Sequence, residues 1–187
     1  MSKRKSQFDS SVKKEFEKFW NQMKESNPRS VAIVGAAYLE HLVEKLLSSF
    51  MVNEDETKQL LEVNGPIGAF ETKAKTAYCL GLITLRMYKN LKLISHIRNA
   101  FAHQIDLSTF NDEWVADKCK ALQLPDIRDS KGALLPALST RDIYEFAIRD
   151  TAISILVEIL DSEDPERRKV LEDAAPFYNP LENDESR

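Results

Sequence analysis

The chain has 187 residues and a formal net charge of −4, with 43% hydrophobic and 30% charged residues. This composition is typical of one globular domain; it excludes a disordered chain and argues against a generally basic nucleic-acid binder. No apolar run approaches the roughly 18 residues of a membrane span, and the N-terminal stretch lacks the apolar core of a signal peptide. Cys79 and Cys119 follow no metal or redox spacing, which favours reduced thiols in a cytoplasmic protein that contacts no membrane.

Charge is concentrated at the two ends of the chain. Residues 1–24 carry seven basic and three acidic side chains, and residues 161–187 carry nine acidic and four basic ones. Such ends are more often solvated than used as binding arms. We therefore predict an N-terminal basic and aromatic helix over residues 1–26, an all-helical domain over 27–162 and an acidic flexible tail over 163–187.

Helical periodicity begins near residue 12. Aromatic and apolar side chains recur at three- and four-residue steps through Met23, which predicts a helix with an aromatic face. Asn27 and Pro28 have the residue types of an N-cap and a first helical position, and a long helix is expected from there to about Met51. A short helix is expected over 54–61, followed by a sharp turn at Asn64-Gly65-Pro66-Ile67-Gly68.

The second half of the chain repeats this helical pattern. Helices are expected over about 69–82, with Gly81 and Thr84 as stop and restart signals, then over 85–102, 110–122 and 140–160. A proline-containing loop, 125–136, separates the last two. No stretch alternates apolar and polar residues long enough to predict a strand. The expected fold class is all-α, a single-domain helical bundle of about six to eight helices.

The segment Ile97-Arg98-Asn99-Ala100-Phe101-Ala102-His103 carries the strongest chemical signal. Arg98 has the side chain best shaped for a phosphate, and His103 can exchange a proton near neutral pH. In a phosphodiester site, His103 would act as general acid or base, Arg98 would hold the phosphate, and Asn99 would orient either group. Arg98, Asn99 and His103 are therefore the candidate catalytic residues.

Helix geometry limits this hypothesis. Positions five apart on a continuous helix point about 140° away from each other. Arg98 and His103 would converge only if the helix ended before His103, or if each met its counterpart on a second subunit. The structural alternative is that Arg98 pairs with Asp106 or Glu113, while His103 interacts with the last helical carbonyls.

Other candidate sites are weaker. His96 and His103 share a helix face, but a metal would need a third ligand, so no metal or cofactor site is predicted. Glu40 and Glu44 form an acid pair in a cleft, belong to the solvated face of their helix, or make an ion pair with Lys45 or a neighbouring helix. A modest basic strip has few aromatic residues beside it, only Tyr78 and Tyr88; its members are Lys73, Lys75, Arg86, Lys89 and Lys92.

The run from Gly65-Pro66-Ile67-Gly68 through Gly81-Leu82-Ile83 resembles the mannitol operon repressor family of bacteria. Together with the helix before it and the segment Ile97 to His103, the resemblance covers roughly residues 28–125. It implies a small all-helical protein in the transcriptional control of sugar-alcohol uptake. No zinc finger, basic zipper or helix-turn-helix pattern accompanies it. The N-terminal helix and the tail lie outside this resemblance.

The Arg-x4-His spacing, with Asn directly after Arg98, is also similar to the signature of HEPN-type helical domains. That resemblance implies a metal-independent ribonuclease or RNA-binding homodimer in which two copies of the motif meet. Two hypotheses follow: a regulator of the mannitol-repressor type, acting through protein or nucleic-acid binding, and a HEPN-like ribonuclease using Arg98 and His103. We rank the regulator first because its resemblance is longer. A homodimer is expected from the second resemblance and from the aromatic face of the first helix.

Overall fold

The computed structural model describes residues 16–21, 23–51, 55–107, 109–125 and 138–162. Six helices are defined in this part of the chain, α2 (Pro28–Phe50), α3 (Asp55–Leu61), α4 (Phe70–Cys79), α5 (Leu85–His103), α6 (Glu113–Lys120) and α7 (Thr140–Ser162). Residues 16–21 and 23–24 are helical as well, and no strand occurs among the described residues. The all-α prediction is confirmed. The predicted acidic tail, most of the 125–136 loop and residues 1–15 of the first segment lie outside the described residues.

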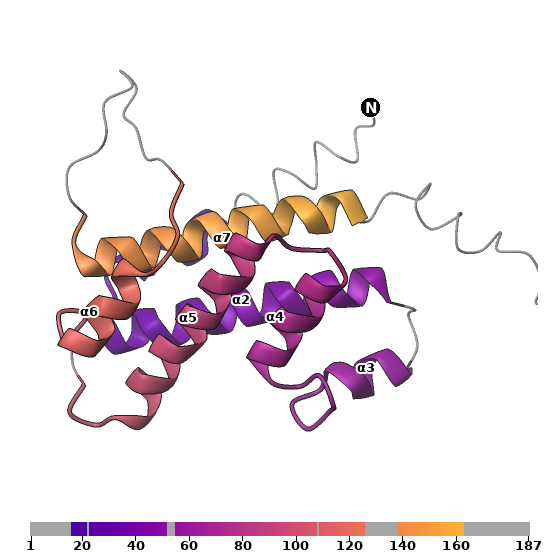
Figure 1. Ribbon diagram of the computed structural model, residues 1–187, viewed down its shortest axis with the longest axis horizontal. Coiled ribbons are helices and arrows are strands. Elements are labelled where there is room, and N and C mark those ends of the chain that lie inside the picture. Colours follow the sequence, from indigo (N-terminus) through magenta and orange to yellow (C-terminus); the bar gives the residue numbers. More distant parts are fainter. Residues whose placement is uncertain (1–15, 22, 52–54, 108, 126–137, 163–187) are drawn as a thin grey trace, which may run out of the picture.

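The two longest helices form the centre of the bundle. α2 packs along α7, and it also contacts α4 and α5 on its other sides. Figure 1 shows α2 and α7 as two long neighbouring rods, with α5 crossing them obliquely and α3 at the edge. One side of α2 is buried along most of its length, because its buried residues, from Val31 to Leu47, recur at helical spacing. None of the described helices combines the length and the apolar character that a membrane crossing requires.

Local sequence signals explain where the helices begin. The Asn27 side chain accepts a hydrogen bond from the Ser30 amide, and Pro28 follows as the first residue of α2, as predicted. Thr84 accepts from the Met87 amide at the start of α5, which confirms the restart signal. At α7, Ser139 and Asp142 exchange side chain to backbone hydrogen bonds of 3.2 Å in both directions, a capping box.

The end of α4 differs from the prediction. The helix ends at Cys79, three residues earlier than expected, because Gly81 has a φ of +71° and reverses the chain. The Gly81 amide donates to the Tyr78 carbonyl and the Leu82 amide to the Ala77 carbonyl, both at 2.9 Å. This is a Schellman motif, which satisfies the last carbonyls of the helix and turns the chain toward α5.

α6 is also shorter than predicted, since it begins at Glu113 rather than at Phe110. The Thr109 amide donates to the Asp112 carboxylate at 3.1 Å, and the Asn111 amide donates to the Thr109 hydroxyl at 2.8 Å. These local hydrogen bonds hold residues 109–112 in a turn and compete with helix formation.

Two arginines connect elements that are far apart in the sequence. Arg29, in the first turn of α2, donates to the Gln104, Ile105 and Leu107 carbonyls after α5, at 2.9–3.1 Å. Arg141 in α7 donates to carbonyls that follow the N-terminal helical stretch, including that of Ser26 at 3.0 Å. Both guanidinium groups therefore join a helix to backbone carbonyls of a distant turn.

Aromatic side chains fill the core between α5, α6 and α7. Phe101 and Tyr144 are fully buried, and both rings contact Phe110 at centroid distances of 5.1 and 5.0 Å. The Tyr144 hydroxyl donates to the Ala32 carbonyl at 3.0 Å, so burial leaves it satisfied. Near them lies Cys119, which is also fully buried, and burial raises the pKa of its thiol to about 12.

The two thiols should therefore react differently. In the native protein we expect iodoacetamide to modify Cys79, which is exposed, and to leave Cys119 unmodified until the chain unfolds. Burial also raises the pKa of Tyr144. In the unfolded chain the Cys119 thiol ionises at its usual pKa of 9.0, whereas in the folded protein it stays protonated up to a pKa of about 12. The free energy of unfolding should therefore fall as the pH rises across that window. Mass spectrometry of the labelled protein checks the thiol reactivity, and labelling of Cys119 in the native protein would contradict it. Denaturation at pH 8 to 11 checks the pH dependence, and an unchanged free energy of unfolding across this range would contradict it.

Candidate functional site

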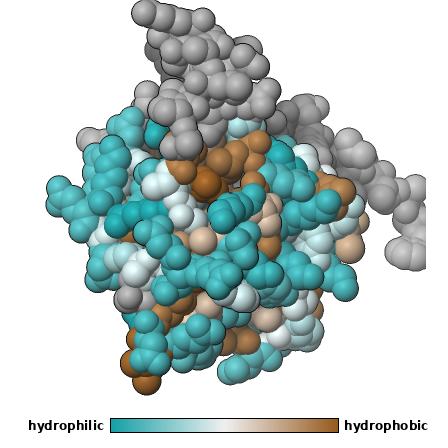
Figure 2. Space-filling model, turned by 60° about the vertical axis from the view of Figure 1, so that its left-hand side comes forward, coloured by the Kyte–Doolittle hydropathy of each residue, from teal (hydrophilic) through white to brown (hydrophobic). Residues whose placement is uncertain are grey.

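The three predicted site residues lie in the last two turns of α5. Arg98 and Asn99 are partly buried, and His103 is the exposed final residue of the helix. From the side that carries α6, the surface of the molecule is mainly hydrophilic, with smaller separate hydrophobic areas (Figure 2). Arg98 and Asn99 are brought together, since Arg98 Nη1 donates to Asn99 Oδ1 at 3.0 Å.

Arg98 forms an ion pair across the α2–α5 contact. Its Nη2 lies 3.2 Å from Glu40 Oε2, and the side chains are 31% and 24% exposed. The predicted pairing with Asp106 or Glu113 was wrong: the partner lies on α2, 58 residues away in the sequence. The charge of Arg98 is thus already compensated by a carboxylate within the chain, which lowers its attraction for a phosphate.

His103 does not approach Arg98. α5 continues through His103, and the chain leaves the helix only at Gln104, whose amide still donates to the Ala100 carbonyl. Positions five apart on this continuous helix point about 140° away from each other. Among the described residues, the His103 ring makes no hydrogen bond or ion pair. On this continuous helix the two side chains point apart, and a shared Arg98–His103 site stays a prediction that requires a second chain.

Glu40 belongs to a larger charge cluster that joins three helices. Lys73 of α4 places its Nζ 2.6 Å from Glu44 Oε2 and 3.7 Å from Glu40 Oε1 of α2. With Arg98 the cluster contains two carboxylates and two cations. The ion pairs of Glu40 and Glu44 with a neighbouring helix, one of the predicted alternatives, are what the structure shows.

The sequence assigned Lys73 to a basic surface strip, and its position in the charge cluster was not predicted. Lys73 is only 2% exposed. The signal was present, because Phe70, Lys73, Ala74 and Ala77 share the buried face of α4 at helical spacing. Burial of Lys73 removes one cation from the strip and weakens the case for a nucleic-acid surface there.

The remaining histidine on α5 also has a carboxylate partner. His96 Nε2 lies 3.1 Å from Glu71 Oε1, and the Ser95 hydroxyl lies 3.4 Å from the same oxygen. Within the described ranges, no group of three or more His, Cys, Asp or Glu side chains is arranged to hold a metal ion.

The connection between α4 and α5 exposes a set of apolar side chains. Tyr78 and Tyr88 stack on each other with ring centroids 5.1 Å apart and planes 8° apart, and Leu80 and Leu85 are 45% and 48% exposed. We call these four residues the α4–α5 patch. The mutual stacking occupies one face of each ring, so the two tyrosines are less available to stack on nucleic-acid bases than the sequence suggested. An exposed apolar cluster of this kind is typical of a protein-binding surface.

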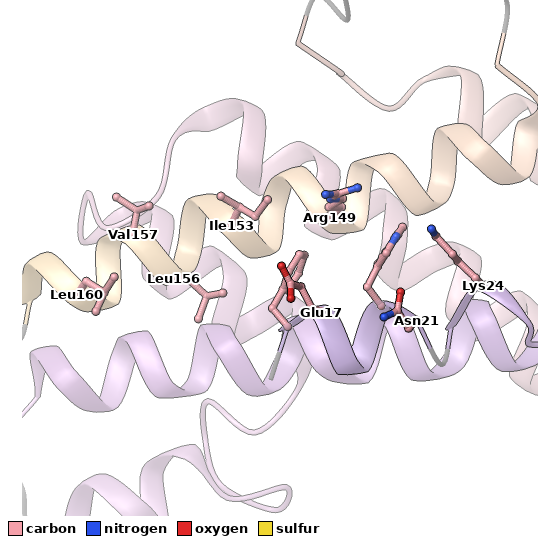
Figure 3. Close-up of a pocket in the computed structure, with 10 residues that line it drawn as sticks. Glu17, Asn21, Lys24, Arg149, Ile153, Leu156, Val157 and Leu160 are labelled. Carbon is pink, nitrogen blue, oxygen red and sulfur yellow. The ribbon is translucent and has the colours of Figure 1, made fainter. Parts of the chain in front are cut away.

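A separate groove of about 400 Å³ lies between the N-terminal helical stretch and α7 (Figure 3). Its apolar side chains include Trp20 and, from α7, Ile153, Leu156, Val157 and Leu160. The cations Lys24 and Arg149 lie toward one end, and the Arg149 guanidinium stands 5.8 Å from the centre of the Trp20 ring. Sequence reasoning did not anticipate this groove, because it is formed by segments more than 120 residues apart.

The N-terminal aromatic face is used inside the chain. Phe16 and Trp20 are each 8% exposed, and Phe19 stacks on Tyr38 of α2 with centroids 4.1 Å apart. This face therefore packs on the bundle, and the argument that it forms a dimer surface was wrong. The homodimer stays a prediction that rests on the second resemblance alone.

Comparison with known families decides the assignment of the chain. Residues 17–133 match a family model described as mannitol repressor, MtlR. The chain belongs to the mannitol repressor family. The match is longer than the resemblance in the sequence indicated, since it begins within the N-terminal aromatic helix. It includes the charge cluster and the α4–α5 patch, whereas the α7 side of the groove lies outside it.

A solved structure has a similar fold. A chain from the X-ray structure of the MtlR–HPr complex from Escherichia coli is 18% identical to this member of the mannitol repressor family, with a TM-score of 0.53. The alignment covers 79% of this chain and 96% of that chain. At this identity the likeness shows a shared fold. No curated protein matches the sequence significantly.

Proposed function

We propose that this member of the mannitol repressor family is a transcriptional regulator that acts by binding a protein partner, without a helix-turn-helix. The α4–α5 patch is the observation that carries the proposal. Tyr78 near the end of α4 stacks on Tyr88 of α5, while Leu80 directly after α4 and Leu85 at the start of α5 are both largely exposed. Aromatic side chains in an apolar centre are enriched at protein interfaces.

Charged residues lie next to the patch residues in the sequence of α5. Lys89 is exposed one residue beyond Tyr88, and Arg86 Nη1 pairs with Asp150 Oδ2 at 2.6 Å. An apolar centre with a polar rim is the usual arrangement of a protein-binding surface. The related fold was solved in a complex with HPr, so HPr is the first partner to test.

The test is a calorimetric titration of HPr into the full chain. We expect saturable binding with a dissociation constant on the order of micromolar, as for transient regulatory interfaces of modest area. Absence of binding at hundreds of micromolar HPr, with the chain shown to be folded by circular dichroism, would contradict HPr as the partner. Loss of the interaction in patch variants, argued in the Discussion, tests the surface separately.

The HEPN-like ribonuclease alternative makes an opposite prediction. Because Arg98 is paired with Glu40 and diverges from His103, we expect a structured RNA pool to stay intact with EDTA present. Arg98→Ala and His103→Ala should behave as the unchanged protein does. Cleavage that leaves 2′,3′-cyclic phosphate ends, and is lost in both variants, would establish the ribonuclease instead.

A further inference from the structure

We propose that the groove between the N-terminal helical stretch and α7 binds the chain's own C-terminal segment, residues 163–187. This inference goes beyond the proposed function and concerns a different face from the α4–α5 patch. Ile153 and Val157 of α7 line the groove and are 45% and 50% exposed. Covering large apolar side chains in such a cluster lowers the free energy of the protein.

The position of the segment makes it a suitable occupant. α7 ends at Ser162, two residues after Leu160, which lines the groove. The 25 residues that follow therefore start at one end of the groove. A chain of about 3.3 Å per residue spans about 45 Å between residues 163 and 177, whereas the helix rise from Leu160 back to Ile153 is only about 10 Å. The segment can thus reach every part of the groove.

The order of residues in the segment matches the order of side chains in the groove. Phe177, Tyr178 and Leu181 lie close together in the sequence, and the acidic residues Glu182, Asp184 and Glu185 come directly after them. In the groove the apolar side chains of α7 lie toward the Leu160 end, and Arg149 and Lys24 lie toward the other end (Figure 3). A segment that turns back from Ser162 and runs along α7 meets the apolar part first and the cations next.

Charge distinguishes this occupant from the other end of the chain. Residues 163–187 contain eight acidic and four basic side chains, whereas residues 1–15 contain five basic and two acidic ones. The groove contributes two cations and the single carboxylate of Glu17. Opposite charge favours the C-terminal segment over the N-terminal one.

Tethering makes even a weak contact effective. A segment joined to α7 has an effective concentration on the order of millimolar, so a site of about 0.1 mM affinity would be occupied about nine-tenths of the time. The segment would then cover the groove until a competing acidic and aromatic sequence displaces it.

Disulfide trapping in the full chain tests the contact. In a Cys79→Ser background, which leaves only the buried Cys119, Val157→Cys is combined with Asn179→Cys beside Tyr178. The matched control combines Asn179→Cys with Glu158→Cys, which is also exposed and one residue further along α7 but does not line the groove. Under mild oxidation we expect the Val157 pair to close about tenfold faster than the control, independently of protein concentration.

Two further variants sharpen the result. Arg149→Glu should slow closure of the Val157 pair toward the rate of the control, because it reverses a charge that faces the acidic residues. Equal rates for the Val157 and Glu158 pairs would overturn the proposal. It would also be overturned by disulfides that form only between chains, and by faster closure of Ser6→Cys than of Asn179→Cys onto Val157→Cys.

Discussion

Leu85→Asp is expected to weaken partner binding strongly without destabilising the protein. Leu85 is the first residue of α5 and is 48% exposed, so its side chain contributes little to the core. The first turn of α5 contains no acidic residue, and a carboxylate near a helix N-terminus is favourable. A charge in the centre of an apolar interface, by contrast, should cost at least about 2 kcal/mol of binding free energy, or about 30-fold in affinity.

The matched control is Ile105→Asp. Ile105 is 90% exposed in the turn after α5 and lies outside the α4–α5 patch. Titration of HPr should show near-normal affinity for this variant, and thermal denaturation should show both variants folded. Equal loss of binding in the two variants would mean that added negative charge, rather than the patch, controls the interaction. Full affinity of Leu85→Asp would place the partner on another surface.

Phe101→Ala should have the largest effect on stability. Phe101 is fully buried, and its ring contacts Phe110, which in turn contacts Tyr144. Its removal leaves a cavity where α5, α6 and α7 meet, and large-to-small changes of this kind cost about 3–5 kcal/mol. Chemical denaturation measures the loss. Phe50→Ala, at a position that is 42% exposed at the end of α2, is the control and should cost much less. Similar small losses in both variants would show that Phe101 does not anchor the core.

Local signals made most of the fold predictable. Asn27 with Pro28, and Thr84, mark helix starts because a side chain oxygen satisfies free amides at those positions. Both α4 and α6 were predicted too long. Apolar periodicity extends beyond the end of α4 and before the start of α6, while the Gly81 reversal ends α4 and the Thr109–Asp112 hydrogen bond holds a turn before α6. Periodicity reports which face is buried, and backbone hydrogen bonding decides where the helix ends.

The Gly65 and Gly68 positions show how a motif can be recognised for a structural reason. A side chain at Gly65 would place its Cβ 2.2 Å from the Gln59 carbonyl oxygen, and one at Gly68 would lie 2.3 Å from that of Glu62. The turn therefore needs glycine where its backbone crosses the end of α3. Gly65 and Gly68, at the start of the run that resembles the family, thus have a packing role.

The candidate site was less predictable, since its contacts are long-range. The sequence places Arg98 near Asp106 and Glu113, but helix packing brings Glu40 of α2 to it instead. In the same way, packing of α4 on α2 buries Lys73 between Glu40 and Glu44. Neither pairing follows from spacing along the chain, because it depends on how the helices cross. The groove and the α4–α5 patch are likewise products of tertiary arrangement.

Hydrogen–deuterium exchange of the full chain, with and without saturating HPr, tests the central claim most directly. If the chain is a regulator that binds a partner through the α4–α5 patch, the partner should slow exchange at residues 77–89 and leave the end of α5 around His103 unchanged. Protection confined to residues 96–107, or no protection anywhere, would contradict the account.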